Sequence, residues 1–265
     1  MTDSAIKIRP GGVLLDIGGV LAIDDQAVPG AVEALAALRR SGLPLRFLTN
    51  TTRRPRRSLV ARLHRLGFAV EPEEILMPAL ACRAVLEAEG LKPHLLVHDD
   101  LEEDFAGLPR GRDAVVVGDA GHDFTYDRLN AAFRCLADGA PLFALARNRV
   151  FMEADGLSMD MGGFVAALEY AAQVEARLFG KPAAAFFAAG VAGLGVAAAA
   201  AVMVGDDADS DIAGARRAGL SAILVRTGKY HAGDERACDP PPDAVADDFP
   251  AAVTLILSAM ETPAA

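Results

Sequence analysis

The apolar residues of this chain fall into short runs that alternate with segments of helical periodicity. An apolar run closed by glycine or a polar cluster is typical of a buried strand, and apolar residues at helical spacing are typical of an amphipathic helix. The runs predict strands at residues 13–17, 43–48, 75–78, 95–97, 114–117, 141–146 and 222–225, and a further strand that ends at residue 205. The periodic segments predict helices at residues 29–41, 53–66, 80–89, 126–137, 163–178, 183–192, 210–218 and 249–260. This alternation predicts an α/β, Rossmann-like fold, in which a parallel sheet carries helices on both faces.

Four polar signals stand at the ends of predicted strands or at glycine-marked turns. The first is Asp16, which follows the apolar residues 13–15 and precedes two glycines. The other three are Thr49-Asn50, Gly180-Lys181-Pro182 and Gly205-Asp206-Asp207. Open α/β sheets bind ligands outside the carboxyl ends of their strands. The four signals are therefore expected to meet at one site.

These signals supply the groups that phosphoryl transfer needs, namely a nucleophile, a cation and donors for the phosphate oxygens. Asp16 can attack phosphorus and form an aspartyl-phosphate. Asp16 and Asp206, with a backbone carbonyl at Gly18, can hold Mg²⁺, which prefers one or two carboxylates. The predicted cofactor is therefore Mg²⁺.

The remaining polar residues fit supporting roles in the same chemistry. The Thr49 hydroxyl and the Asn50 amide can donate to phosphate oxygens, and Lys181 brings a point charge to the transferring group. Asp207 and Asp211 can orient metal-bound waters.

Each signal taken alone also has a purely structural interpretation. Thr49-Asn50 can be an ordinary strand-to-helix turn. Gly180-Lys181-Pro182 can be a helix stop followed by a helix start, and the aspartates at 206, 207 and 211 can be N-terminal helix charges. All four signals occur in this order, each at a strand end or a glycine turn, and this combination favours the catalytic interpretation.

The set Asp16-Ile17-Gly18-Gly19-Val20-Leu21, Thr49-Asn50, Lys181 and Gly205-Asp206-Asp207 resembles the four motifs of the haloacid dehalogenase (HAD) superfamily. The resemblance covers nearly the whole chain. It implies a HAD-like three-layer parallel-sheet core, with an inserted smaller α/β cap domain between the second and third motifs. The implied core is residues 1–79 and 179–265, and residues 80–178 would form a cap that covers the site.

The resemblance also implies roles for individual residues in Mg²⁺-dependent phosphatase chemistry. Asp16 and Lys181 would be catalytic. The implied substrate-binding residues are Asp16, Ile17, Gly18, Thr49, Asn50 and Lys181. The implied metal ligands are Asp16, Gly18 and Asp206, supported by Asp207 and Asp211.

Gly18 departs from the pattern of most phosphatases of this superfamily, which have an acid–base Asp at that position. Glycine supplies no proton to a leaving group. We therefore expect activity on pyrophosphate, on phosphoramidates such as phospholysine or phosphohistidine, and on activated aryl phosphates, above activity on sugar phosphates. The alternative is a weakly active or inactive regulatory or binding protein that keeps the metal site. A signalling receiver domain, a third reading, resembles this chain poorly.

Composition and net charge limit the kinds of partner that we expect this chain to bind. The chain of 265 residues is 52% hydrophobic, ample for a core, and its net charge of −10 argues against nucleic acid or an anionic membrane as a partner. A small phosphorylated substrate is compatible with that charge, because a metal can reverse the local field. The uncharged segment 182–205 is interrupted by glycines and predicts a buried helix and a strand rather than a membrane span.

The cysteines and the first ten residues indicate the cellular compartment that we expect for this protein. Three scattered cysteines without a CxxC motif predict reduced, mostly buried thiols, and residues 1–10 lack the apolar core of a signal peptide. We expect a cytoplasmic protein. Apolar helix faces of the insertion could also support a homodimer.

Several polar clusters in the insertion are weaker candidates. His98-Asp99-Asp100 and Asp119 with His122-Asp123 have ligand-type side chains, but solvated loop residues are the preferred interpretation. Asn148, Arg149 and Asp160 are candidates for reaching the substrate.

Overall fold

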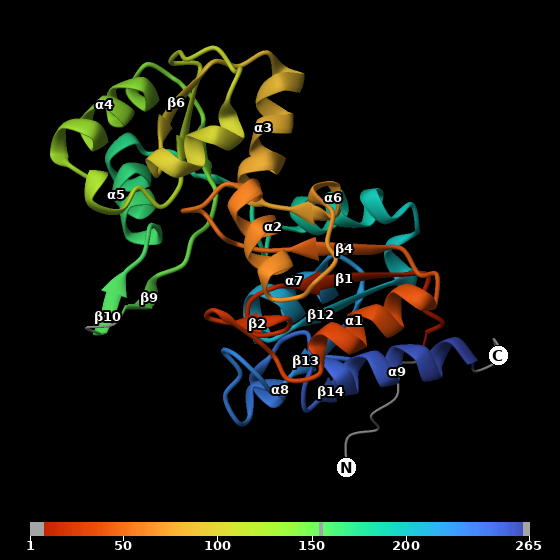
Figure 1. Ribbon diagram of the computed structural model, residues 1–265. Helices are drawn as coiled ribbons and strands as arrows, with labels where there is room; N and C mark the ends of the chain where they lie inside the picture. The colour runs from red at the N-terminus through yellow and green to blue at the C-terminus, as the bar shows by residue number, and fades with distance from the viewer. Residues whose placement is uncertain (1–7, 154–155, 262–265) are drawn as a thin grey trace. The chain divides into compact units, whose positions relative to one another are not determined.

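The computed structural model describes residues 8–153 and 156–261, and its chain divides into two compact units (Figure 1). The first unit comprises the described parts of 1–49, 60–76 and 181–265, and the second comprises 50–59 and 77–180. The second unit therefore begins and ends within three residues of the predicted insertion 80–178 and also takes in residues 50–59. That this unit covers Asp16 stays a prediction.

A six-stranded sheet forms the centre of the first unit. Its strands are β1 (Gly12–Asp16), β4 (Leu45–Leu48), β5 (Ile75–Leu76), β12 (Ala201–Gly205), β13 (Ser221–Val225) and β14 (Ala244–Ala246). Their order is β14-β13-β12-β1-β4-β5, and every neighbouring pair is parallel. All residues of β1, β12 and β13 are buried, as expected for continuous apolar runs covered on both faces. The predicted parallel α/β fold is confirmed.

Helices lie on both faces of this sheet (Figure 1). Helices α1 (Ala31–Arg40) and α9 (Phe249–Glu261) pack against each other, and α9 also contacts β13 and β14. Helices α6 (Ala184–Leu194) and α7 (Gly214–Arg217) pack against each other; α6 lies against β1 and β4, and α7 lies against β13. A Cβ at Gly190 would stand 3.3 Å from Leu14 and 3.4 Å from Leu48, so glycine lets α6 approach the sheet closely.

Short elements complete the first unit. They are the hairpin of β2 (Ala22–Ile23) and β3 (Gln26–Ala27), the 3₁₀ turns η1 (Pro72–Glu74) and η4 (Ala198–Ala200), the π-helical turn η5 (Ala208–Ala213) and helix α8 (Asp234–Ala237). Helix α2 (Arg56–Arg65) passes from the second unit into the first. The apolar segment 182–205 forms α6, η4 and β12. None of the described helices has both the length and the apolar character that a membrane span needs.

The second unit has its own parallel sheet and its own core. Its strands β6 (Pro93–Leu96), β7 (Ala114–Val117), β8 (Leu142–Ala144) and β11 (Arg177–Leu178) pair in the order β11-β8-β7-β6. The helices are α3 (Pro78–Glu89), α4 (Tyr126–Ala137) and α5 (Gly162–Ala172), with 3₁₀ segments η2 (Asp99–Phe105) and η3 (Gly121–Asp123). A buried cluster that includes Val115, Val116 and Phe143 fills the space between them.

Several elements differ from the prediction. Strand β14 of the central sheet and the hairpin of β2 and β3 lie outside every predicted strand. The helix predicted at 163–178 ends at Ala172, because Gln173 adopts a left-handed backbone (φ 54°), and Arg177–Leu178 joins the sheet as β11. Strands β9 (Val150–Glu153) and β10 (Gly156–Met159) form an antiparallel hairpin that no apolar run predicts. The strand predicted at 75–78 stops at Leu76, since Pro78 is the first residue of α3.

Candidate active site

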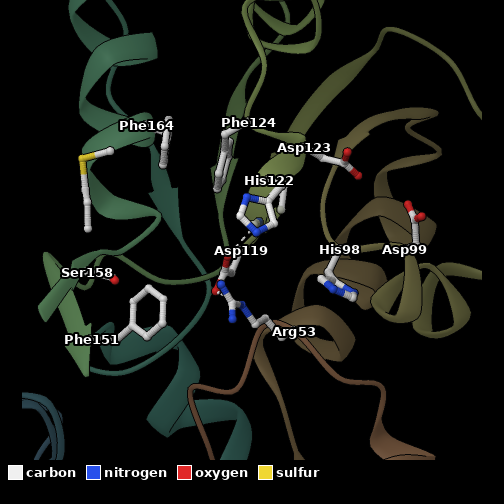
Figure 2. Close-up of a pocket in the computed structure, with 13 residues that line it drawn as sticks. Arg53, His98, Asp99, Asp119, His122, Asp123, Phe124, Phe151, Ser158 and Phe164 are labelled. Atoms are coloured by element: carbon white, nitrogen blue, oxygen red, sulfur yellow. Dashed lines mark hydrogen bonds and ion pairs between the residues drawn. The ribbon is translucent and has the colours of Figure 1, made fainter. Parts of the chain in front are cut away.

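The second unit contains a pocket, and its lining includes several residues for which the sequence favours solvated loops (Figure 2). The cavity has a volume of about 390 Å³. Its lining includes Arg53, His98, Asp99, Asp119, His122, Asp123, Phe124, Phe151 and Phe164. The solvated-loop interpretation is wrong for Asp119, which is only 8% exposed and accepts a hydrogen bond from Arg53 Nε at 2.5 Å.

Two carboxylates of this pocket, those of Asp119 and Asp123, are paired with arginines. Asp119 is already neutralised by the Arg53 guanidinium, which lies 4.9 Å from the centre of the Phe151 ring. Asp123 pairs with Arg128 at 2.6 Å. Within residues 8–153 and 156–261, the only cluster of three or more potential ligands lies elsewhere, in the first unit.

The three weaker candidates beside this pocket make backbone contacts. The carbonyls of Asn148 and Arg149 accept hydrogen bonds from Gly162 N and Asp160 N, both at 3.0 Å. Asp160 is buried, and its Oδ1 accepts a hydrogen bond from Met161 N at 2.6 Å. Burial raises the pKa of Asp160 above its ordinary value. These contacts shape the loop before α5.

In the first unit, strand pairing brings the predicted signals to one edge of the sheet. Asp16 is the last residue of β1, and its Cα pairs with Leu48, the last residue of β4. Leu15 pairs with Val204 on the neighbouring strand β12. Gly205, the last residue of β12, therefore lies beside Asp16, and Asp206 follows directly after it. The parallel arrangement therefore places Asp16, Asp206 and the start of the Thr49-Asn50 motif at the carboxyl edge.

Lys181 is the buried cation of the site. Its Nζ lies 2.6 Å from Asp16 Oδ1 and 2.6 Å from Asp211 Oδ1, and the residue is only 4% exposed. Burial alone would lower the pKa of Lys181, but the carboxylates of Asp16 and Asp211 raise it above the ordinary value. The ammonium group therefore stays charged and links β1 to η5.

The residues after β12 place two further carboxylates. Asp206 and Asp211 are 2% and 0% exposed. Asp211 Oδ2 accepts a hydrogen bond from Asp207 N at 3.2 Å, and Asp207 Oδ1 accepts one from Ser210 N at 2.9 Å at the start of η5. A Cβ at Gly205 would collide with the Asp211 side chain, so only glycine lets η5 fold back so closely.

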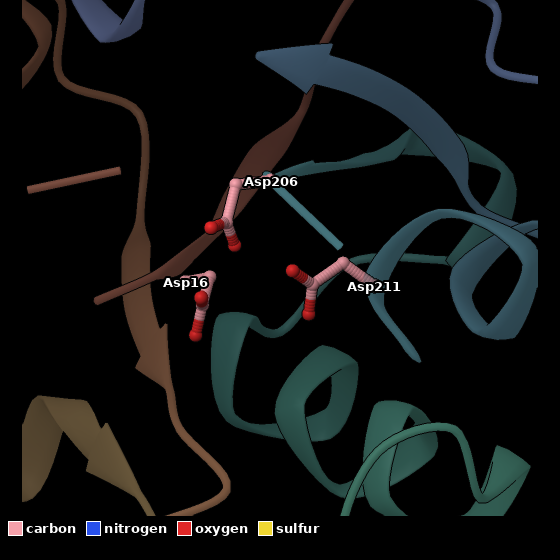
Figure 3. A group of neighbouring side chains, drawn as sticks. All are labelled: Asp16, Asp206 and Asp211. Atoms are coloured by element: carbon pink, nitrogen blue, oxygen red, sulfur yellow. The ribbon is translucent and has the colours of Figure 1, made fainter. Parts of the chain in front are cut away.

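Asp16, Asp206 and Asp211 form a compact carboxylate cluster (Figure 3). One oxygen from each lies within 4.8 Å of the others. Burial and the neighbouring carboxylates raise the pKa of Asp206 to about 8, and burial is the main cause that raises the pKa of Asp211 to about 6. Negative charge in this cluster is therefore costly, and a bound cation would relieve it.

The oxygens available to a cation differ among the three carboxylates. Lys181 binds Asp16 Oδ1, and Lys229 N donates to Asp206 Oδ2. These contacts engage one oxygen of each of the two carboxylates, Oδ1 of Asp16 and Oδ2 of Asp206. Both Asp211 oxygens are engaged, by Lys181 and by Asp207 N. The donor set fits a hard cation held by Asp16 and Asp206, with Asp211 beside it.

The other predicted site residues occupy distinct environments. Gly18 is exposed, and the nearest atom to a Cβ built there is Asp16 Oδ2, at 4.0 Å. The Ile17 side chain is 2% exposed in the core, so only its main chain can reach a ligand. Thr49 is buried at the end of β4, and its N–H donates to Leu76 O at 3.3 Å. Asn50 follows it as the first residue of the second unit.

One part of the site had no predicted role. The turn after β13 contributes Lys229, whose backbone N–H donates to Asp206 Oδ2 at 2.7 Å and whose Nζ lies 3.1 Å from Asp207 Oδ2. Thr227 Oγ1 donates to Gly19 O at 2.5 Å. A backbone donor has no residue-type signature, so no side-chain motif points to it.

Comparison with known proteins gives the family. A family model described as "Haloacid dehalogenase-like hydrolase" matches residues 13–108, and one described as "HAD-hyrolase-like" matches residues 178–252. The human haloacid dehalogenase-like hydrolase domain-containing protein 2 is 45% identical over 92% of this chain and 95% of its own length. The phospholysine phosphohistidine inorganic pyrophosphate phosphatase of Rattus norvegicus is 41% identical over 94% of this chain and 95% of its own length.

Solved structures agree with these relatives. The glycerol phosphate phosphatase of Mycobacterium tuberculosis, crystallised with magnesium, is 29% identical, with a TM-score of 0.82 over 93% of this chain and 78% of its own. The 4-nitrophenylphosphatase of Thermotoga maritima shares the fold, with a TM-score of 0.86 over 94% of this chain and 98% of its own, at 24% identity. The two family matches, the extent of the curated relatives and the shared fold lead to one conclusion: this chain is a hydrolase that belongs to the haloacid dehalogenase-like family.

Proposed function

We propose that this protein is a Mg²⁺-dependent phosphohydrolase that acts through an aspartyl-phosphate on Asp16. The observation that carries the proposal is the pairing of Asp16 Oδ1 with a buried Lys181, beside Asp206 and Asp211. The substrate is a small phosphorylated molecule, in agreement with the phosphatases among the relatives.

The chemistry proceeds in two displacements at phosphorus. The Asp16 carboxylate attacks phosphorus, the new O–P bond forms, and the bond from phosphorus to the leaving group breaks. Water then cleaves the acyl phosphate, which releases inorganic phosphate and restores the carboxylate. Lys181 neutralises charge beside the nucleophile, and its raised pKa keeps it cationic through both steps.

Asp16 and Asp206 would hold the cation through the oxygens that face away from Lys181 and Lys229. Mg²⁺ at that position would offset the charge of the phosphate oxygens. Thr49 and Asn50 would donate to the same oxygens.

Gly18 carries the substrate preference within this proposal. No side chain at position 18 can protonate an alkoxide, which is a poor leaving group. Pyrophosphate leaves as phosphate, and the nitrogen of a phosphoramidate takes a proton from solvent. The name of the relative from Rattus norvegicus includes all three such substrates: phospholysine, phosphohistidine and pyrophosphate. The alternative function is a weakly active binding protein. It is argued from the same residue, because Gly18 stands where most phosphatases of this superfamily have the acid–base Asp.

A panel assay separates the two proposals. Purified protein with Mg²⁺ is tested for phosphate release from pyrophosphate, phospholysine, phosphohistidine, para-nitrophenyl phosphate and a sugar phosphate, with Asp16→Asn as the blank. We expect release from the first four substrates, loss of all activity in EDTA, and little release from the sugar phosphate. Release no faster than that of the Asp16→Asn blank on every substrate would instead favour the binding protein.

A further inference from the structure

The turn after β13, residues 227–229, contacts the acidic site at three points. Thr227 Oγ1 donates to Gly19 O at 2.5 Å, in the loop that follows the nucleophile strand. Lys229 N donates to Asp206 Oδ2 at 2.7 Å. Lys229 Nζ lies 3.1 Å from Asp207 Oδ2. We call residues 227–229 the β13 turn.

Two glycines enclose the Asp206 carboxylate where the β13 turn meets the loop after β1. Gly228 has φ 60° and Gly19 has φ 72°, both in the left-handed region. A Cβ on either residue would collide with the Asp206 carboxylate, and one on Gly228 would also press on Gly19 Cα. The backbones therefore pack directly against Asp206, as only glycine at both positions allows.

Without a restraint, repulsion from the neighbouring carboxylates would favour rotation of the Asp206 side chain. Its carboxylate is buried, and one oxygen from each of Asp16, Asp206 and Asp211 lies within 4.8 Å of the others. Rotation away from Asp16 would reduce the repulsion between like charges. The Lys229 N–H holds one oxygen, and the flanking backbones of Gly19 and Gly228 block the space for rotation.

We propose that the β13 turn is a positioning element that fixes the Asp206 side chain as a ligand of the cation that Asp206 and Asp16 would share. Thr227 secures the turn to the loop after β1, Gly228 permits the close approach, and Lys229 supplies the N–H. This inference rests on the proposed Mg²⁺ site and assigns three residues to its support. Partners that orient metal ligands typically change metal affinity by about 10–100-fold when they are removed.

The test measures Mg²⁺ affinity of the intact protein by isothermal titration calorimetry, with urea unfolding in the absence of Mg²⁺ as a record of folding. Thr227→Val removes the hydroxyl with little change of shape, and we expect the dissociation constant to rise about 10-fold. Thr227→Ser keeps the hydroxyl and should restore the wild-type value. Thr254→Val removes a hydroxyl that bonds Pro250 O in α9, and it should leave Mg²⁺ affinity unchanged.

Gly228→Ala tests the close approach, with an expected loss of affinity of about 10–100-fold. Gly219→Ala is the matched control, because Gly219 also has a positive φ (84°) but no atom lies within 4 Å of its Cβ position. It should lose the stability that a positive φ costs an alanine and keep its Mg²⁺ affinity.

The outcomes separate this inference from the proposed function. If the wild type binds Mg²⁺ and folded Thr227→Val and Gly228→Ala bind it equally well, the positioning role is wrong and the metal site stands. Equal losses in Gly228→Ala and Gly219→Ala would show general strain and would also overturn the role. If the wild type itself does not bind Mg²⁺, the proposed metal site is wrong, and so is this inference, which rests on it.

Discussion

At the residue scale, Asp16, the proposed nucleophile, forms an ion pair with a buried lysine. Lys181 Nζ lies 2.6 Å away, and the strand end holds the carboxylate at the edge of the sheet. Asp16→Asn keeps nearly the same shape but cannot form the acyl phosphate. We expect turnover of para-nitrophenyl phosphate to fall by on the order of 10⁴-fold or more, as for other lost nucleophiles, with a melting temperature close to that of the wild type. A folded variant that keeps most of its turnover would disprove the aspartyl-phosphate.

Gly18 is the second residue for which we predict an effect on the chemistry. The space around it is open, because only Asp16 Oδ2 lies as near as 4.0 Å to a Cβ at this position. An Asp can therefore be accommodated and could protonate an alkoxide. Gly18→Asp should raise kcat/KM for a sugar phosphate by roughly 10²–10⁴-fold if the acid is well placed. Gly18→Asn, which cannot donate in this way, is the control. Wild-type protein that prefers alkyl phosphates would show that another group supplies the proton.

At the scale of elements, Lys181 joins β1 to η5 through two buried ion pairs. Lys181→Met removes the cation and leaves Asp16, Asp206 and Asp211 to repel one another. Loss of one partner of a buried ion pair typically costs about 3–5 kcal/mol. We expect the free energy of unfolding in urea to fall by about that amount without Mg²⁺, and Mg²⁺ to restore part of it.

The control for Lys181→Met is a variant that breaks an exposed ion pair. Arg112→Met breaks the pair with Asp138, whose side chains are 59% and 72% exposed, and should cost less than about 1 kcal/mol. Equal effects of the two variants would mean that the Lys181 contacts contribute no more than a surface pair.

At the scale of the whole molecule, the two units should respond differently to Mg²⁺. Asp16, Asp206 and Asp211 all belong to the first unit, whereas the second unit has a separate core. Saturating Mg²⁺ at about 100 times its dissociation constant would stabilise the binding unit by about 2.7 kcal/mol. Hydrogen exchange should therefore slow in β1, β12 and η5 and stay unchanged in β7 and β8.

Asp206→Ala should abolish this protection, and Asp247→Ala, a change at a side chain that is 82% exposed, should preserve it. Equal slowing of β7 and β8 by Mg²⁺ would contradict the assignment of the ion to the first unit alone.

The sequence by itself is enough to predict the fold class, the family and most of the elements. Continuous apolar runs such as 13–15 and 202–204 define central strands because both faces of a parallel sheet are buried. The strand-end residues Asp16 and Asp206 are predictable for the same reason, since parallel strands bring their carboxyl ends to one edge. The catalytic roles assigned to them stay predictions until they are measured.

Short strands at the edge of a sheet and the exact ends of helices cannot be predicted from apolar runs in this way. The strand β11 has two residues, and its pairing with β8 depends on a partner more than thirty residues away in the chain. The end of α5 depends on the left-handed backbone of Gln173, a conformation that its residue type rarely adopts.

What only the tertiary structure decides is the set of contacts around each carboxylate. Sequence order cannot show that both oxygens of Asp211 are engaged, or that Lys229 N–H holds Asp206. Nor can it show that Asp119 is buried against Arg53, 66 residues away, where a solvated loop is expected. Apolar periodicity determines which segments become strands and helices, because burial acts on every residue of a run. Hydrogen bonds between distant loops depend instead on distances and angles that exist only after the chain has folded.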